Sequence, residues 1–139
     1  MTFRLPGVTP PIFSAASLGH QAQFRRCYDQ GEQEANAGHY ASALGWFEAA
    51  TKIAPTEPAA WLYQAVCLIH LGQPQAALAM ADQLLSYAPD CAQGWLFRGV
   101  ALHRLGRYKA AYASYDKAEA LSAKSLLGGS EFSAGHAEQ

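Results

Sequence analysis

Histidine and cysteine are the residue types in this chain that could hold a metal ion, and the sequence contains five histidines and three cysteines. Cys67 and His70 have the spacing that places two side chains on one face of a helix, and His103 could approach them from a neighbouring unit. Zinc needs three or four ligands, and no further cysteine, histidine or aspartate pair has a suitable spacing. We therefore expect no metal and no other cofactor, with Cys67 as a small buried residue.

Catalytic motifs are absent from the sequence, which has no phosphate-cradling loop, no nucleophile elbow and no paired-carboxylate site. The formal net charge of -1 gives no general attraction to nucleic acid or to an anionic membrane. No apolar run approaches the roughly 20 residues of a membrane span. The three cysteines form no even set and no CxxC pair, which favours a reducing compartment. We expect a cytoplasmic protein that is not an enzyme and binds neither nucleic acid nor membrane.

A set of residues recurs with a period of thirty-four, and this period predicts the fold. The recurring sets are Gly38, Gly72 and Gly106; Gly31, Ala65 and Gly99; Ala43, Ala77 and Ala111; Phe47, Ala81 and Tyr115; Trp61 and Trp95; and Pro55 and Pro89. The glycine at 38, 72 and 106 ends a helix and reverses the chain, the small residues let two helices approach closely, and the prolines end the second helix. Each unit is therefore predicted to be a helix hairpin.

The combination of tryptophan, small residues, turn glycine, aromatics and closing proline resembles the tetratricopeptide repeat (TPR). The resemblance implies an all-α solenoid of three hairpins with a right-handed superhelix, in units of about 24–57, 58–91 and 92–125. The departures are Cys27 for the tryptophan, Ala81 for an aromatic residue, Leu84 for a small residue and Ala123 for the proline. The expected helices span about 17–37, 40–53, 57–71, 74–87, 91–105 and 108–123. The expected domains are an extended arm at 1–16, the repeats at 17–127 and a flexible tail at 128–139.

The resemblance also implies a binding groove on the first helix of each unit. Its predicted partner-binding residues are Tyr28, Glu32, Leu62, Tyr63, Val66, Ile69, His70, Leu96, Phe97, Val100, His103 and Arg104, with Arg25, Asn36 and Gln93 at matching positions. Leu62, Val66, Leu96 and Val100 could instead belong to the core between repeats. Unit two carries only Asp82 and Asp90 as charged residues, and a surface so poor in charge favours a partner.

Some co-chaperones of the family hold a chaperone's C-terminal carboxylate with a clamp of lysine, asparagine and arginine. The matching positions here carry Tyr28, Glu32, Tyr63, Gln93 and Phe97, so the clamp is absent. The sequence therefore predicts an adaptor, assembly factor or chaperone-like module that binds an apolar or amphipathic segment of a protein partner. A chaperone like those of type III secretion is a further alternative.

Charge is spread unevenly along the repeats, from -2 in units one and two to +4 in unit three. This gradient is either a solvated surface or a device that orients a ligand or favours head-to-tail assembly of copies. A self-assembling scaffold is therefore the alternative function. The apolar arm "FRLPGVTPPIF" could cover the groove or remain a frayed terminus.

Overall fold

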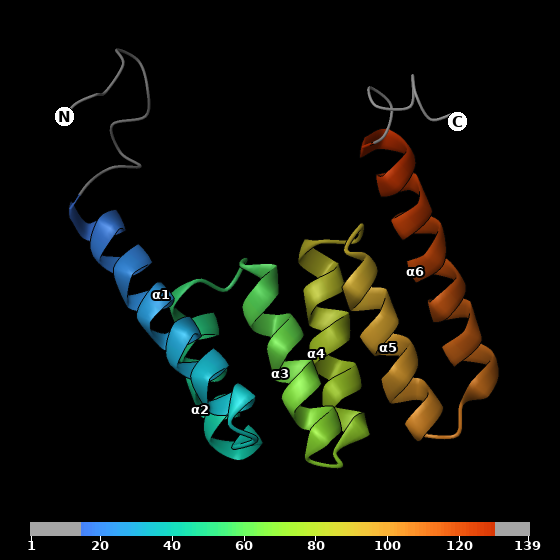
Figure 1. Ribbon diagram of the computed structural model, residues 1–139, viewed down its shortest axis with the longest axis horizontal. Helices are drawn as coiled ribbons and strands as arrows, with labels where there is room; N and C mark the ends of the chain where they lie inside the picture. Colours follow the sequence, from blue (N-terminus) through green and yellow to red (C-terminus); the bar gives the residue numbers. More distant parts are fainter. Residues whose placement is uncertain (1–14, 130–139) are drawn as a thin grey trace.

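The computed structural model describes residues 15–129, which form six α-helices in a row of hairpins (Figure 1). The helices are α1 (Ala15–Asn36), α2 (Tyr40–Ile53), α3 (Pro58–His70), α4 (Pro74–Tyr87), α5 (Ala92–Arg104) and α6 (Tyr108–Gly129). The hairpins pair α1 with α2, α3 with α4 and α5 with α6, while α2 packs on α3 and α4 on α5. The predicted all-α solenoid is confirmed.

The turn inside each hairpin is formed by the recurring glycine. Gly38, Gly72 and Gly106 all have positive φ, between 74° and 84°. In the second hairpin the backbone N–H of Gln73 donates to the carbonyl oxygen of Leu68 at 2.8 Å, which satisfies an acceptor at the end of α3. Only glycine adopts this conformation without strain, so the period of thirty-four positions the three reversals.

The linkers between hairpins are held by the recurring tryptophans. The indole Nε1 of Trp61 donates to the carbonyl oxygen of Pro55 at 2.6 Å, and Trp95 donates to Pro89 at 2.8 Å. Each tryptophan thereby ties the first turn of its helix to the loop that precedes it. The same pair of residue types fixes both junctions, which explains why tryptophan and proline recur together.

Small residues allow the close helix contacts that the sequence predicts. A Cβ atom built on Gly31 would lie 2.8 Å from Cε1 of Phe47, and one on Gly99 would lie 2.5 Å from Cε1 of Tyr115. The pairing of a small residue with a large one therefore recurs within hairpins one and three. Two buried clusters result, one around Ala43, Phe47 and Cys67 and a larger one that joins α3, α4, α5 and α6.

Both outer helices are longer than the sequence predicts. Helix α1 begins at Ala15, so the last two residues of the predicted arm are helical, and α6 continues to Gly129 instead of ending near 123. Helices α2 and α4 end shortly before Pro55 and Pro89, but Ala123 occupies the equivalent position in α6 and leaves it free to continue. The rest of the predicted arm and tail, residues 1–14 and 130–139, lies outside the described residues.

Candidate functional site

The first helices of the three hairpins and the residues just before two of them border an open hollow of about 370 Å³. We call it the central hollow; it is lined by Tyr28, Glu57, Pro58, Ala59, Leu62, Tyr63, Cys91 and Gln93. Its walls therefore come from α1, from the start of α3 and from the residues around the start of α5. Three separate units contribute to one depression, so its shape depends on the packing of the whole solenoid.

Aromatic rings fix the wall that α1 and α3 share. The ring of Tyr28 stacks on Phe24 with a centroid distance of 5.8 Å and meets Tyr63 edge-on at 5.9 Å. Buried Phe47 lies behind both tyrosines, at 5.6 Å from Tyr28 and 5.5 Å from Tyr63. Because contacts from several directions hold these rings, they need little ordering when a ligand arrives.

The Tyr28 hydroxyl remains protonated over the physiological range. Burial, followed by the nearby Tyr63 and Glu32 groups, raises its pKa to about 12. The hydroxyl can therefore donate a hydrogen bond to a ligand.

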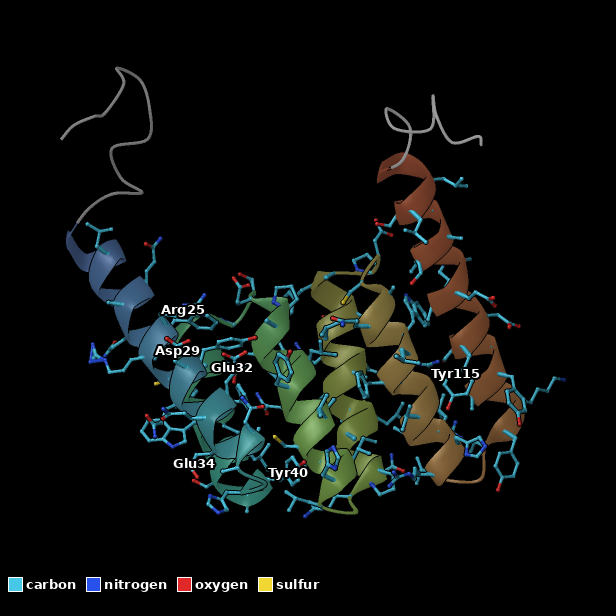
Figure 2. All side chains as sticks on the ribbon, viewed as in Figure 1. Arg25, Asp29, Glu32, Glu34, Tyr40 and Tyr115 are labelled. Atoms are coloured by element: carbon cyan, nitrogen blue, oxygen red, sulfur yellow. The ribbon has the colours of Figure 1, made fainter. Side chains whose placement is uncertain are left out.

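Charged groups follow one another along α1 beside this wall, as Figure 2 shows for Arg25, Asp29 and Glu32. Nη1 of Arg25 donates to Oδ1 of Asp29 at 3.1 Å, and the guanidinium lies 5.3 Å from the Tyr28 ring centroid. Within the described part of the chain, Glu32 has no ion-pair partner. Its half-buried carboxylate disfavours an acidic ligand and favours a hydrogen-bond donor or a cation.

The C-terminal ends of α3 and α5 carry further predicted site residues. The His70 ring stacks on Tyr40 of α2 at 4.2 Å, and Nη1 of Arg104 approaches the carbonyl oxygen of Ile69 at 3.4 Å. Val66 and Phe97 are half-buried. These side chains continue the surface of α3 and α5 away from the central hollow.

Four of the predicted site residues have close neighbours in other helices of the row. Ile69 belongs to the larger core cluster, and Leu62 is only 6% exposed, at the edge of the central hollow. Leu96, one period after Leu62, lines a second hollow together with Tyr115 of α6. The ring centroids of His103 and Tyr108 lie 4.9 Å apart. Ile69 therefore contributes mainly to the core, whereas Leu62 contributes both to the contact between hairpins and to the lining of the central hollow.

The remaining predicted residues are distributed over the three first helices. They are Tyr28 and Glu32 on α1, Tyr63, Val66 and His70 on α3, and Phe97, Val100 and Arg104 on α5. Val100 also packs against the larger core cluster. Of these, Tyr28 and Tyr63 lie together in the central hollow, whereas Phe97 and Val66 do not line it.

The sequence reasoning missed the linker residues that complete the central hollow. Glu57, Pro58 and Cys91 lie at the junctions between hairpins and contribute to its lining. The repeat pattern considers only positions inside the first helices, so it gives no weight to residues at their starts. The recurring prolines that end the second helices were the available signal that these junctions lie close to the binding face.

Histidine, cysteine and acidic side chains are not clustered in the described residues, and the Cys67 thiol is buried. Residues 15–129 contain no group of three or more His, Cys, Asp or Glu side chains that could hold a metal ion. Burial raises the pKa of the Cys67 thiol to about 11, which keeps it in the unreactive neutral form. In the same residues, none of the helices is both long and apolar enough to cross a membrane.

Sequence comparison identifies the repeat. Two tetratricopeptide repeat models match the chain, one over residues 35–101 and the other over residues 92–125. No curated protein sequence matches it.

Solved structures share the fold at low sequence identity. The Sgt2 TPR domain from Aspergillus fumigatus is 22% identical with a TM-score of 0.70, over 73% of this chain and 67% of that one. The first TPR of Spaghetti (RPAP3), bound to the HSP90 peptide SRMEEVD, is 16% identical with a TM-score of 0.70, over 72% and 79%. The Yersinia enterocolitica type III secretion translocator chaperone SycD is 17% identical with a TM-score of 0.71, over 73% and 77%.

Proposed function

Since the chain belongs to the tetratricopeptide repeat family, we propose that it binds an apolar or amphipathic segment of a partner protein across α1, α3 and α5. Domains of this family are generally interaction modules without catalytic activity. The role we assign is that of an adaptor, assembly factor or chaperone-like protein in the cytoplasm. The observation that carries the proposal is the central hollow, where three units meet around prearranged aromatic rings.

The chemistry of the central hollow favours one aliphatic or aromatic anchor side chain with polar groups beside it. Leu62, Pro58 and the two tyrosine rings supply apolar surface. The protonated Tyr28 hydroxyl and the Gln93 amide supply hydrogen bonds to the backbone of an extended or helical segment. Anchors seated in such preformed pockets carry most of the binding energy in many interfaces.

An acidic C-terminal tail is the ligand that this surface disfavours. Spaghetti is a TPR protein that binds the HSP90 peptide SRMEEVD. Here the Glu32 carboxylate lies beside Tyr28, and Asp29 neutralises Arg25, so a second carboxylate would meet uncompensated negative charge. We therefore expect SRMEEVD itself not to bind.

Peptide selection followed by calorimetry tests this function. Peptides selected from a random library against the full chain should bind wild type and lose at least roughly tenfold in affinity with Tyr28→Ala or Tyr63→Ala, which remove the two tyrosines that line the central hollow. Tyr108→Ala is the matched control, because this exposed tyrosine lies at the start of α6 beside His103. Circular dichroism confirms that each variant is folded. Selected peptides that bind both variants as tightly as wild type would place the interface elsewhere.

The synthetic peptide SRMEEVD serves as a second probe in the same calorimeter. Micromolar binding of this peptide would contradict the exclusion of acidic tails. A chaperone role of the kind named for SycD is the alternative function, and the fold similarity alone supports it. The identity of a protein that wild type captures from the native cell, and that the Tyr28→Ala and Tyr63→Ala variants do not capture, would distinguish the two roles.

A further inference from the structure

None of the helices in residues 15–129 covers the outer face of the last hairpin, and we propose that a second copy of this chain docks its α1 there, head to tail. The docked α1 continues the repeat in the register by which α3 follows α2 and α5 follows α4. This inference goes beyond the peptide site, because it uses the two ends of the row; Gln93 is the residue that its receiving surface shares with the lining of the central hollow.

The C-terminal end carries a hollow of about 340 Å³. We call it the end hollow; it is lined by Ala92, Gln93, Leu96, Tyr115, Ala118, Glu119 and Ser122. Leu96 is 41% exposed, whereas Leu62, one period earlier, is 6% exposed because α5 packs against its hairpin. A further helix packed at this end would bury the exposed side chain of Leu96 in the same way.

The junction between α4 and α5 shows which side chains must fit together in this register. A Cβ atom on Gly94 of α5 would overlap Cδ2 of Leu84 and lie 3.0 Å from Cδ2 of Leu85. The two leucines on α4, the helix that receives the next hairpin, therefore require a glycine on α5, the helix that packs onto it. We call these the receiving helix and the arriving helix. A larger arriving residue would need smaller or more polar residues opposite it.

The two ends of the row carry this combination, a larger residue on α1 and a smaller and a more polar residue on α6. One period after Leu84 and Leu85 stand Ala118 and Glu119 on α6, and two periods before Gly94 stands exposed Arg26 on α1. In the stacked register Arg26 of the second copy therefore meets Ala118 and Glu119 of the first. The short alanine leaves room for the arginine, and the glutamate supplies the opposite charge.

A second polar position repeats this complementarity. At the junction of α2 and α3, Nε2 of Gln64 donates to Oγ1 of Thr51 at 3.0 Å. One period before Gln64 stands Gln30, and two periods after Thr51 stands Glu119. The arriving α1 thus brings an amide donor as well as a guanidinium to the same carboxylate.

The lengths of the outer helices also match. Because α3 and α5 begin at Pro58 and Ala92, the register places the equivalent start at residue 24, nine residues after Ala15. Because α2 and α4 end at Ile53 and Tyr87, the equivalent end is residue 121, eight residues before Gly129. Both extensions project on the same side of the row in Figure 1. Stacked copies would bring them side by side in antiparallel directions.

Exposed leucines on these extensions supply apolar contact for the stacked arrangement. Leu18 on α1 is 50% exposed and Leu126 on α6 is 72% exposed. Because each copy has both a donor end and a receiving end, the contact is heterologous and the assembly grows with concentration. The proposal therefore predicts open-ended chains of copies in place of a closed symmetric dimer.

Charge-swap variants test the docking by sedimentation velocity of the full chain over a concentration series. Wild type should self-associate, and Arg26→Glu or Glu119→Arg should each weaken association at least roughly tenfold, because like charges then face one another. The double variant R26E/E119R should recover association. Lys109→Glu is the control, since this exposed α6 residue does not line the end hollow, and it should behave as wild type.

Mixing the two single variants gives the sharpest result. The glutamate introduced on α1 of one variant can face the arginine introduced on α6 of the other, and the remaining contact is the native pair. An equimolar mixture should therefore associate although each variant alone does not. Circular dichroism verifies that both variants fold. A wild type that stays monomeric, or a mixture as weakly associated as its components, would overturn the proposal and indicate another occupant, such as residues 1–14 or a foreign helix.

Discussion

The side chains of Gln64 and Thr51 form a buried hydrogen bond between two hairpins, with 3.0 Å between Nε2 and Oγ1. Gln64 is 4% exposed and Thr51 is 7% exposed, so water cannot replace either partner readily. The Thr51 hydroxyl in turn donates to the carbonyl oxygen of Glu48 at 2.8 Å. A buried polar link of this kind fixes the register of α3 on α2.

Thr51→Val should lower the free energy of unfolding by about 1–3 kcal/mol, because it leaves the buried Gln64 amide without its acceptor. The double variant T51V/Q64L should lose less than the sum of the two single changes, since it removes both polar groups. Urea unfolding measures all three. Ser86→Ala, which removes an exposed hydroxyl on α4, should stay within about 0.5 kcal/mol of wild type. Strictly additive losses would show that the pair is not coupled.

Gly99→Ala should destabilise the protein by about 1–3 kcal/mol, because the added methyl group would overlap the Tyr115 ring and press on the Ala111 carbonyl oxygen. Tyr115 points from α6 toward α5, as Figure 2 shows. The control is Gly45→Ala on α2, where a Cβ would meet nothing within 4 Å. It should stabilise the helix by about 0.5–1 kcal/mol. Thermal unfolding that moves both variants in the same direction would contradict the packing argument.

Stability should fall as the pH rises above about 9, because the pKa values of Cys67 and Tyr28 are raised on folding, to about 11 and about 12. Between its unfolded and folded pKa values each group keeps its proton only in the folded state, so the unfolded chain gains stability with each increment of pH. Cys67→Ala removes the thiol contribution. Urea unfolding at about pH 8 and about pH 10.5 should therefore show a smaller loss for this variant than for wild type. Equal losses would mean that Cys67 does not contribute.

The fold followed from local features of the sequence. A glycine with positive φ, a tryptophan that binds the preceding loop and a small residue opposite a large one each have a local physical cause, and they recur in register. The C-terminal end of α6 did not follow, because no residue such as Pro55 or Pro89 stops this helix.

The candidate site could be predicted only in part. The repeat period and the family positions led to the same prediction for Leu62 and Leu96, yet Leu62 is buried and Leu96 is exposed. Their difference depends on whether another hairpin follows, which is a property of the assembled row and not of the repeat. The linker residues of the central hollow were missed for a related reason, since they become neighbours only after the hairpins pack.

Arg98 connects two hairpins, and its replacement by methionine gives a further test. Nε donates to Oδ1 of Asp82 on α4 at 2.8 Å, while Nη1 donates to the hydroxyl of Ser114 on α6 at 2.8 Å. The Asp82 side chain is half exposed, so that ion pair contributes about 0–1 kcal/mol and is weakened by salt. Ser114 is buried, so the second bond persists in salt and its loss costs about 1–3 kcal/mol.

Arg98→Met should therefore destabilise the protein more than Asp82→Asn, and the difference should remain at high salt. Urea unfolding at low and at molar sodium chloride measures both variants. Arg104→Met is the matched control, because this exposed arginine makes only a 3.4 Å contact with a carbonyl oxygen, and its effect should be under about 0.5 kcal/mol. We expect the larger loss of unfolding free energy for Arg98→Met, because no water can replace the arginine at the buried Ser114 hydroxyl. A larger loss for Asp82→Asn would show instead that the surface ion pair between Arg98 and Asp82 makes the main contribution.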